Sequence, residues 1–179
     1  MKYLRSFFTL IIAVVLSCPM NAKDPSSALV VKSTVDAMVV FAKPTKMSKK
    51  KGSAALKDLE YDITALTLCD SISVTASVIT ATPLVLDSVC VECGVQSLKY
   101  SLERIFVEPK GKNWLSRIRF YIPMRDFVFL TSSDVAPILI FSPNSENAPA
   151  FEDKRSKWLD RKQVYNLIIN ILNQNHEKN

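Results

Sequence analysis

Hydrophobic and polar residues alternate along two neighbouring runs in the middle of the chain. In residues 59–64, and again in residues 72–78, every second residue is apolar. A period of two is typical of a strand with one buried face and one exposed face. Because the turn-like residues 68–71 separate the two runs, the pattern predicts a β-hairpin whose second strand ends at Pro83.

Further apolar runs follow at short intervals and predict four more strands, in residues 84–92, 98–107, 114–122 and 136–142. The alternation predicts that Ile118, Phe120 and Ile122 face the core. In the run 98–107 the alternation slips near residues 103–104, which indicates a β-bulge.

Three segments carry helical signals. Residues 28–42 follow two serines that can cap a helix, and their spacing predicts a helix, although a strand fits nearly as well. Residues 123–131 predict a short helix after Pro123, against a β-branched and aromatic content that favours a strand. A C-terminal helix is expected over residues 160–175, where Asp160 and Gln163 resemble a capping box. Its apolar stripe consists of Val164, Leu167, Ile168, Ile171 and Leu172.

The N-terminus has the layout of a bacterial signal peptide, with a positive start, an apolar stretch of about ten residues and a short polar exit. Cleavage after Ala22 predicts a soluble exported protein, periplasmic or extracellular. Alternatively, the sequence that ends in Cys18 resembles the lipobox of bacterial lipoproteins. That resemblance implies lipidation of Cys18 and a mature protein that is anchored to a membrane through this lipid alone.

These patterns predict a mainly β protein. We expect a single antiparallel domain resembling a β-sandwich, with a C-terminal amphipathic helix on one face and an α+β arrangement as the alternative. Residues 1–22 form the expected signal peptide, 23–57 an N-terminal segment and basic linker, and 58–179 the β-rich domain. After removal of the expected signal peptide, residues 23–179 are enough to bury a hydrophobic core of their own.

The mature chain is basic, and much of its positive charge lies in one segment. The full sequence carries a formal net charge of +6, and five lysines crowd residues 43–51. A run of like charges is usually solvated, so we expect a mobile linker, with an anionic lipid or polysaccharide surface as the functional alternative. No aromatic residues are interleaved for base stacking, and therefore nucleic acid is not an expected partner.

Three cysteines remain after Cys18, and export favours a disulfide between two of them. Pairing of Cys69 with Cys90 or with Cys93 is expected in preference to a strained bond within the Cys-Val-Glu-Cys motif. The alternative is thiol-disulfide chemistry at Cys90 and Cys93. A redox site of this type places its cysteines at a helix N-terminus, whereas this motif follows a predicted strand.

Catalytic signals are otherwise sparse. The chain has three glycines, too few for a phosphate-cradling loop, and one histidine, His176, near its C-terminus. No cofactor, metal site or catalytic set is therefore expected. Aromatic and basic residues that could form a binding surface are Trp114, Trp158, Arg117 and Arg119.

Together, these observations predict an exported, non-catalytic module of the cell envelope, with a binding or structural role toward a protein or glycan. A thiol-disulfide or redox-active protein that uses Cys90 and Cys93 is the alternative.

Overall fold

A computed structural model describes residues 24–33, 37–142 and 148–176. The predicted signal peptide and Cys18 lie outside the described residues. The elements are η1 (Pro25–Ala28), β1 (Leu29–Ser33), β2 (Met38–Lys49), β3 (Leu59–Leu66), β4 (Ser71–Thr80), β5 (Ser88–Cys93), β6 (Gln96–Ser101), β7 (Glu103–Lys110), β8 (Asn113–Pro123), α2 (Met124–Ser132), β9 (Ile138–Phe141), β10 (Ala150–Glu152) and α3 (Arg155–His176).

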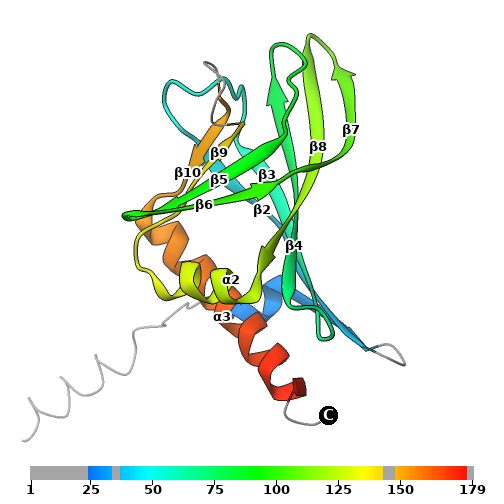
Figure 1. The fold of residues 1–179 in the computed structure, drawn as a ribbon, viewed down its shortest axis with the longest axis vertical. Coiled ribbons are helices and arrows are strands. Elements are labelled where there is room, and N and C mark those ends of the chain that lie inside the picture. Colours follow the sequence, from blue (N-terminus) through cyan, green and yellow to red (C-terminus); the bar gives the residue numbers. More distant parts are fainter. Residues whose placement is uncertain (1–23, 34–36, 143–147, 177–179) are drawn as a thin grey trace, which may run out of the picture.

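The described strands belong to one antiparallel sheet, which confirms the predicted mainly β fold with a C-terminal helix. The strand order is β6-β5-β9-β10-β2-β3-β4-β8-β7, and β1 pairs with β2 beside this path. The predicted hairpin is β3 with β4, where Ile63 lies opposite Val74. Figure 1 shows the strands curving round an interior, with both helices at one end.

The sheet curves back on itself because its two outermost strands, β6 and β7, are joined by a single residue. The strands β6 and β7 stand at opposite ends of the strand order, yet only Leu102 lies between them in sequence. The Leu102 amide donates to the Asp87 carbonyl at 2.9 Å, and the Tyr100 ring on β6 stacks on Phe120 of β8 at 6.3 Å. The predicted strand 98–107 is therefore two strands, and the expected irregularity is a register shift against β8 between Arg104 and Phe106.

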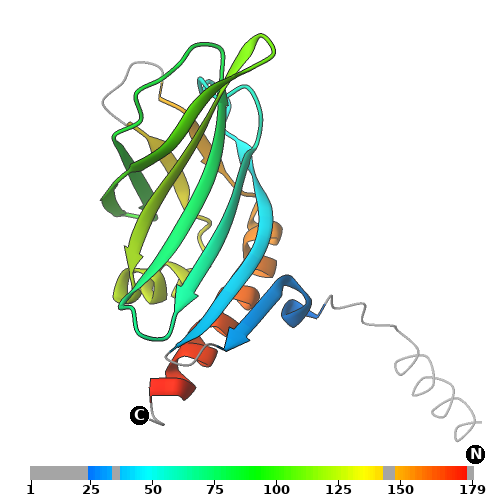
Figure 2. The same cartoon turned by 90° about the vertical axis from the view of Figure 1, so that its right-hand side faces the viewer.

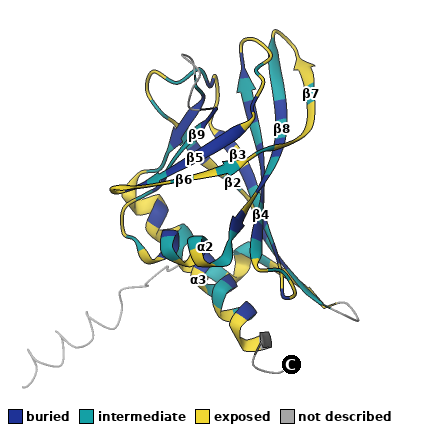
Figure 3. Ribbon diagram, in the orientation of Figure 1, coloured by how far each residue is buried: buried dark blue, intermediate teal, exposed yellow. Residues whose placement is uncertain are grey.

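The core fills the concave side of this rolled sheet. As predicted, Ile118, Phe120 and Ile122 of β8 are buried. Figure 3, coloured by burial, shows that β6 and β7 are mostly exposed, in contrast to the inner strands of the sheet. The short helix α2 confirms the helix predicted after Pro123, and it buries Phe127 and Leu130 against the interior.

The predictions for residues 28–42 and for the basic segment after them are wrong. Residues 28–42 contain β1 and most of the first half of β2 in place of a helix, because the alternation that buries Val40 and Ala42 prevails over the helical spacing. The basic segment is not a linker either, since β2 continues to Lys49. Met47 is buried within it and lies opposite Leu59 of β3.

One edge of β2 has a gap between two partner strands. Along this edge β1 pairs with residues 38–42 and β10 pairs with Ser48 and Lys49. Pro44 has no backbone N–H, and the pairing with β3 on the other edge shifts register at the same place. We call residues 43–47 on this edge the β2 gap.

Helix α3 lies beside the β2 gap and begins earlier than predicted. It starts at Arg155, so Asp160 is inside the helix and does not cap it. The residues it buries are Trp158, Tyr165, Ile168 and Leu172, so the inward-facing stripe begins at Trp158, nearly two turns before Val164, and includes two aromatic rings. Figure 2 shows α3 running along the side of the curved sheet.

We predict that the substitution Ile168→Ala lowers the free energy of unfolding by about 2–5 kcal/mol, because it leaves a cavity at a fully buried helix position. Urea denaturation monitored by circular dichroism measures this loss. The control Asn170→Ala changes an exposed residue of the same helix and should stay within about 0.5 kcal/mol of the wild type. Equal stability of the two variants would contradict the docking of α3.

Candidate functional site

An open groove lies between η1, the β2 gap and α3. It encloses about 610 Å³, within the range of about 300–1,000 Å³ that is common for ligand sites. We call it the α3 groove. Its lining combines apolar residues with side chains that donate or accept hydrogen bonds, and it comprises Asp24, Pro25, Ser27, Ala28, Thr45, Lys46, Lys157, Asp160, Arg161, Gln163 and Val164.

The floor of the groove is fixed by a buried ion pair between Arg161 and Asp153. The side chain of Asp153 is 1% exposed and that of Arg161 is 11% exposed. The Arg161 guanidinium also donates to the Lys46 carbonyl in the β2 gap and lies over the Tyr61 ring, 5.6 Å from its centroid. One side chain thereby joins α3 to the segment after β10, to β2 and to β3.

Beneath this ion pair, the hydroxyls of Tyr61 and Tyr165 form a buried hydrogen bond of 2.7 Å. Burial, and then the neighbouring Tyr61, raises the pKa of Tyr165 well above its ordinary value, so this hydroxyl stays protonated at neutral pH. The Tyr165 ring packs against Phe127 and Trp158, with centroid distances of 5.5 and 6.1 Å. These contacts make the floor of the groove a rigid part of the core.

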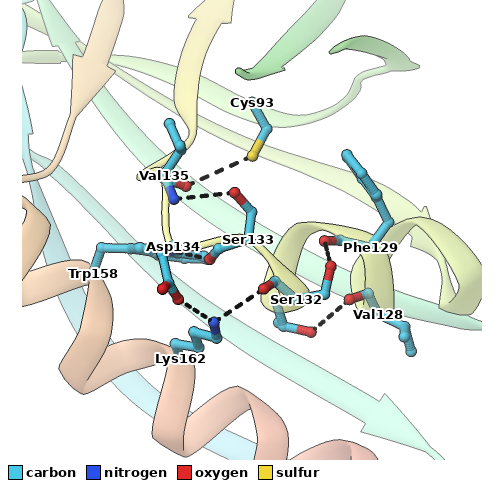
Figure 4. Close-up of polar contacts among 10 residues, drawn as sticks. Cys93, Val128, Phe129, Ser132, Ser133, Asp134, Val135, Trp158 and Lys162 are labelled. Carbon is cyan, nitrogen blue, oxygen red and sulfur yellow. Dashed lines mark hydrogen bonds and ion pairs between the residues drawn. The ribbon is translucent and has the colours of Figure 1, made fainter. Parts of the chain in front are cut away.

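A second set of contacts fastens α3 to the loop after α2 (Figure 4). Lys162 donates to the Ser132 carbonyl at 3.1 Å and to Asp134 at 2.6 Å, while the Trp158 indole N–H donates to the Ser133 carbonyl at 3.0 Å. The hydrogen bond from Lys162 holds the pKa of Asp134 below its usual value. Helix α3, which lines the groove, is therefore fixed by polar contacts to β2 and the segment after β10 and by polar contacts to the loop after α2.

The three cysteines of the domain are free thiols. Cys90 and Cys93 lie on β5, where a spacing of three residues sends side chains to opposite faces. The Cys90 sulfur lies 2.9 Å from the Ser97 hydroxyl, whereas Cys93 lies 3.6 Å from the Val135 carbonyl. Cys69 is in the turn between β3 and β4. The structure thus supplies neither the predicted cysteine pairing nor a helix N-terminus for thiol chemistry.

The residues predicted to form a shared binding surface do not come together. Trp158 is 3% exposed and belongs to the core, and Trp114 is half-buried at the start of β8. On the outer face of β8, Arg117 binds Asp62 and Ser77, at 2.7 and 2.8 Å, and Arg119 lies 3.8 Å from Glu103. Arg117 thus reaches across β4 to β3, and Arg119 contacts the neighbouring strand β7.

The interior also contains a cavity of about 60 Å³ beneath the helices, with an almost entirely apolar lining. This volume is small compared with ordinary ligand pockets, so the cavity is a packing defect of the core in this conformation. Among the described residues, no three histidine, cysteine or carboxylate side chains gather where they could hold a metal ion. No helix in the described part of the chain has both the length and the apolar character needed to span a membrane.

The sequence pattern does not reveal the α3 groove, because the segments that line it are distant in sequence. Asp153 and Arg161 are spaced by eight residues, but they lie on either side of the start of α3. A signal was nevertheless available, since Arg161 and Tyr165 are four residues apart and share one helix face. In comparisons with known proteins, no protein-family model, curated sequence or solved structure matches the chain.

We predict that Arg161→Met destabilises the protein by about 3–5 kcal/mol, because it leaves the Asp153 carboxylate buried without its partner. The double variant Asp153→Leu/Arg161→Met removes both charges and should recover at least about 1 kcal/mol of this loss. Chemical denaturation of both single variants and the double variant measures the coupling. Additive losses would show that the two side chains do not interact in solution.

We also predict that one thiol of the folded, mature protein reacts rapidly with a thiol reagent and that two react only on unfolding. Cys69 is half-buried, whereas Cys90 and Cys93 are 8% and 4% exposed. Absorbance with Ellman's reagent, with and without denaturant, counts them, and Cys69→Ser should remove the fast phase. Fewer than three thiols in the denatured protein would instead support the disulfide that the sequence predicts.

Proposed function

We propose that this protein is an exported, non-catalytic binding module of the bacterial cell envelope, and that the α3 groove takes a segment of an envelope glycan. The observation that carries the proposal is the groove itself, an open site of about 610 Å³ whose floor is tied into the core. Rigid elements on both sides suit recognition, because a preformed site loses little conformational entropy when it binds.

The charges of the groove favour a neutral ligand. Lys46 and Lys157 are balanced by Asp24 and Asp160, and Arg161 is neutralised by Asp153. The Asp24 carboxylate accepts hydrogen bonds from Ser26, which lower its pKa, so Asp24 keeps its negative charge near neutral pH. Balanced charges combined with serine, threonine and glutamine side chains suit the hydroxyl and acetamido groups of N-acetylated sugars.

We predict that a β-1,4-linked tetramer of N-acetylglucosamine shifts the amide resonances of groove residues in an NMR titration of the mature protein. The double variant Lys157→Ala/Gln163→Ala should bind roughly 30-fold more weakly, because two hydrogen-bonding side chains of about 1 kcal/mol each are lost.

The matched control is Asn166→Ala/Asn170→Ala, which changes two exposed residues of the same helix outside the groove and should leave the affinity within twofold. Absence of shifts at millimolar tetramer, or equal weakening by both double variants, would refute the proposed site.

A further inference from the structure

We propose a second binding site, for an acidic polysaccharide, which adjoins the α3 groove at one residue and extends to the end of the sheet remote from η1. There a hollow of about 520 Å³ opens on the outer face of the sheet. Four lysines from three parts of the chain line it, and they are Lys46, Lys49, Lys57 and Lys110. We call it the lysine hollow. It does not depend on the proposed function of the α3 groove.

Strand register brings these lysines together. Lys46 and Lys49 lie on β2, Lys57 precedes β3, and Lys110 ends β7. The neighbouring ends of β4 and β8 bring these segments to one end of the sheet, since Thr80 pairs with Trp114 and Lys110 with Asn113. Three further lysines adjoin them in the turns at this end, namely Lys50, Lys51 and Lys112.

The positive charge of the hollow is available to a ligand. Its lining contains two carboxylates, Asp58 and Glu60, against four ammonium groups, and three of these lysines remain when Lys46 is assigned to the balanced α3 groove. Within the described residues, none of the four lysines forms an ion pair. Asp58 is already engaged, because it accepts a hydrogen bond from the Lys49 amide at 3.1 Å. A cluster of unpaired like charges raises the local concentration of anions.

The shape of the site favours a sugar polymer over a bilayer. Leu56, Ile79 and Leu115 contribute apolar surface within the hollow. The apolar face of a sugar ring can lie on such a surface while carboxylates on successive rings reach lysines at the rim. A lipid headgroup layer is broad and flat, and it would contact the rim and leave the hollow unfilled.

The hollow adjoins the α3 groove at Lys46, which lines both, and the rest of it lies far from the start of the described chain. Residue Ala42 of β2 pairs with Leu29 near η1, and seven residues of extended strand separate it from Lys49, about 23 Å. Figures 1 and 2 show the turns that carry the lysines at the end opposite η1 and the C-terminus of α3.

Binding of oligogalacturonate to the mature protein, measured by isothermal titration calorimetry in 50 mM and 300 mM NaCl, tests the proposal. The variant Lys49→Gln/Lys57→Gln/Lys110→Gln should weaken binding at least on the order of tenfold, and salt should weaken binding by the wild type. Lys46 is left unchanged because its side chain also lines the α3 groove.

The matched control Lys32→Gln/Lys99→Gln/Lys154→Gln removes the same charge at exposed positions outside the hollow and should change affinity less than twofold. Equal losses in both triple variants would overturn the proposal, because net charge alone would explain them. So would tighter binding to vesicles with 25% phosphatidylglycerol or to single-stranded DNA than to oligogalacturonate.

The two sites are told apart by exchanging variants and ligands. The triple lysine variant should retain its affinity for the N-acetylglucosamine tetramer, and the groove variant Lys157→Ala/Gln163→Ala should retain its affinity for oligogalacturonate. Loss of oligogalacturonate binding in the groove variant would place the acidic ligand in the α3 groove and refute the lysine hollow.

Discussion

The packing of helix α3 against the sheet depends on how the backbone groups of one short strand edge, the β2 gap, find hydrogen-bond partners. Between β1 and β10, the β2 gap leaves peptide groups on this edge that no described strand pairs. Arg161 donates to the Lys46 carbonyl, and Asp153 neutralises the arginine. Helix α3 thereby supplies a hydrogen-bond donor to the edge of the sheet and also covers its apolar interior. The α3 groove lies where the helix meets this edge.

The same strand also separates two electrostatic environments. On the side of α3, the charges around β2 are balanced, and Arg161 is withdrawn into a buried pair. On the outer face and toward the C-terminal end of β2, the lysine side chains form no ion pair with any described residue, although Lys49 donates a hydrogen bond to the Leu56 carbonyl at 3.4 Å. Apart from Lys46, which lines both, the two surfaces present different charged residues and can therefore select ligands of different charge.

Local alternation was sufficient to predict the strands whose two faces differ clearly. The β3–β4 hairpin and the inward residues Ile118, Phe120 and Ile122 of β8 were predicted because every second residue in these strands is buried. The segment 28–42 was predicted wrongly because its apolar residues satisfy both a helical and a strand period.

Features that depend on distant partners were beyond reach of the sequence pattern. The lysines of β2 indicated a linker because their like charges dominate, and the structural signal among them is the single buried Met47. Trp158 has basic neighbours and therefore resembled a surface aromatic, whereas its indole N–H bonds to Ser133 within the α2–α3 contact. The expected pairing of Cys69 with Cys90 or Cys93 rested on composition, whereas Cys69 lies in the β3–β4 turn and the two other cysteines lie on β5 as free thiols.

The strand order also determines at what stage of synthesis and folding the strand edges are paired and thereby protected from aggregation. Sheet partners β2 and β10 come from opposite ends of the chain, and β9 joins β10 to β5. Until the last strands are available, β2 and β5 therefore present unpaired edges that can recruit other chains. Contacts of such long sequence separation form slowly. The vulnerable period of this protein thus lasts until its C-terminal quarter has been made and has closed the sheet.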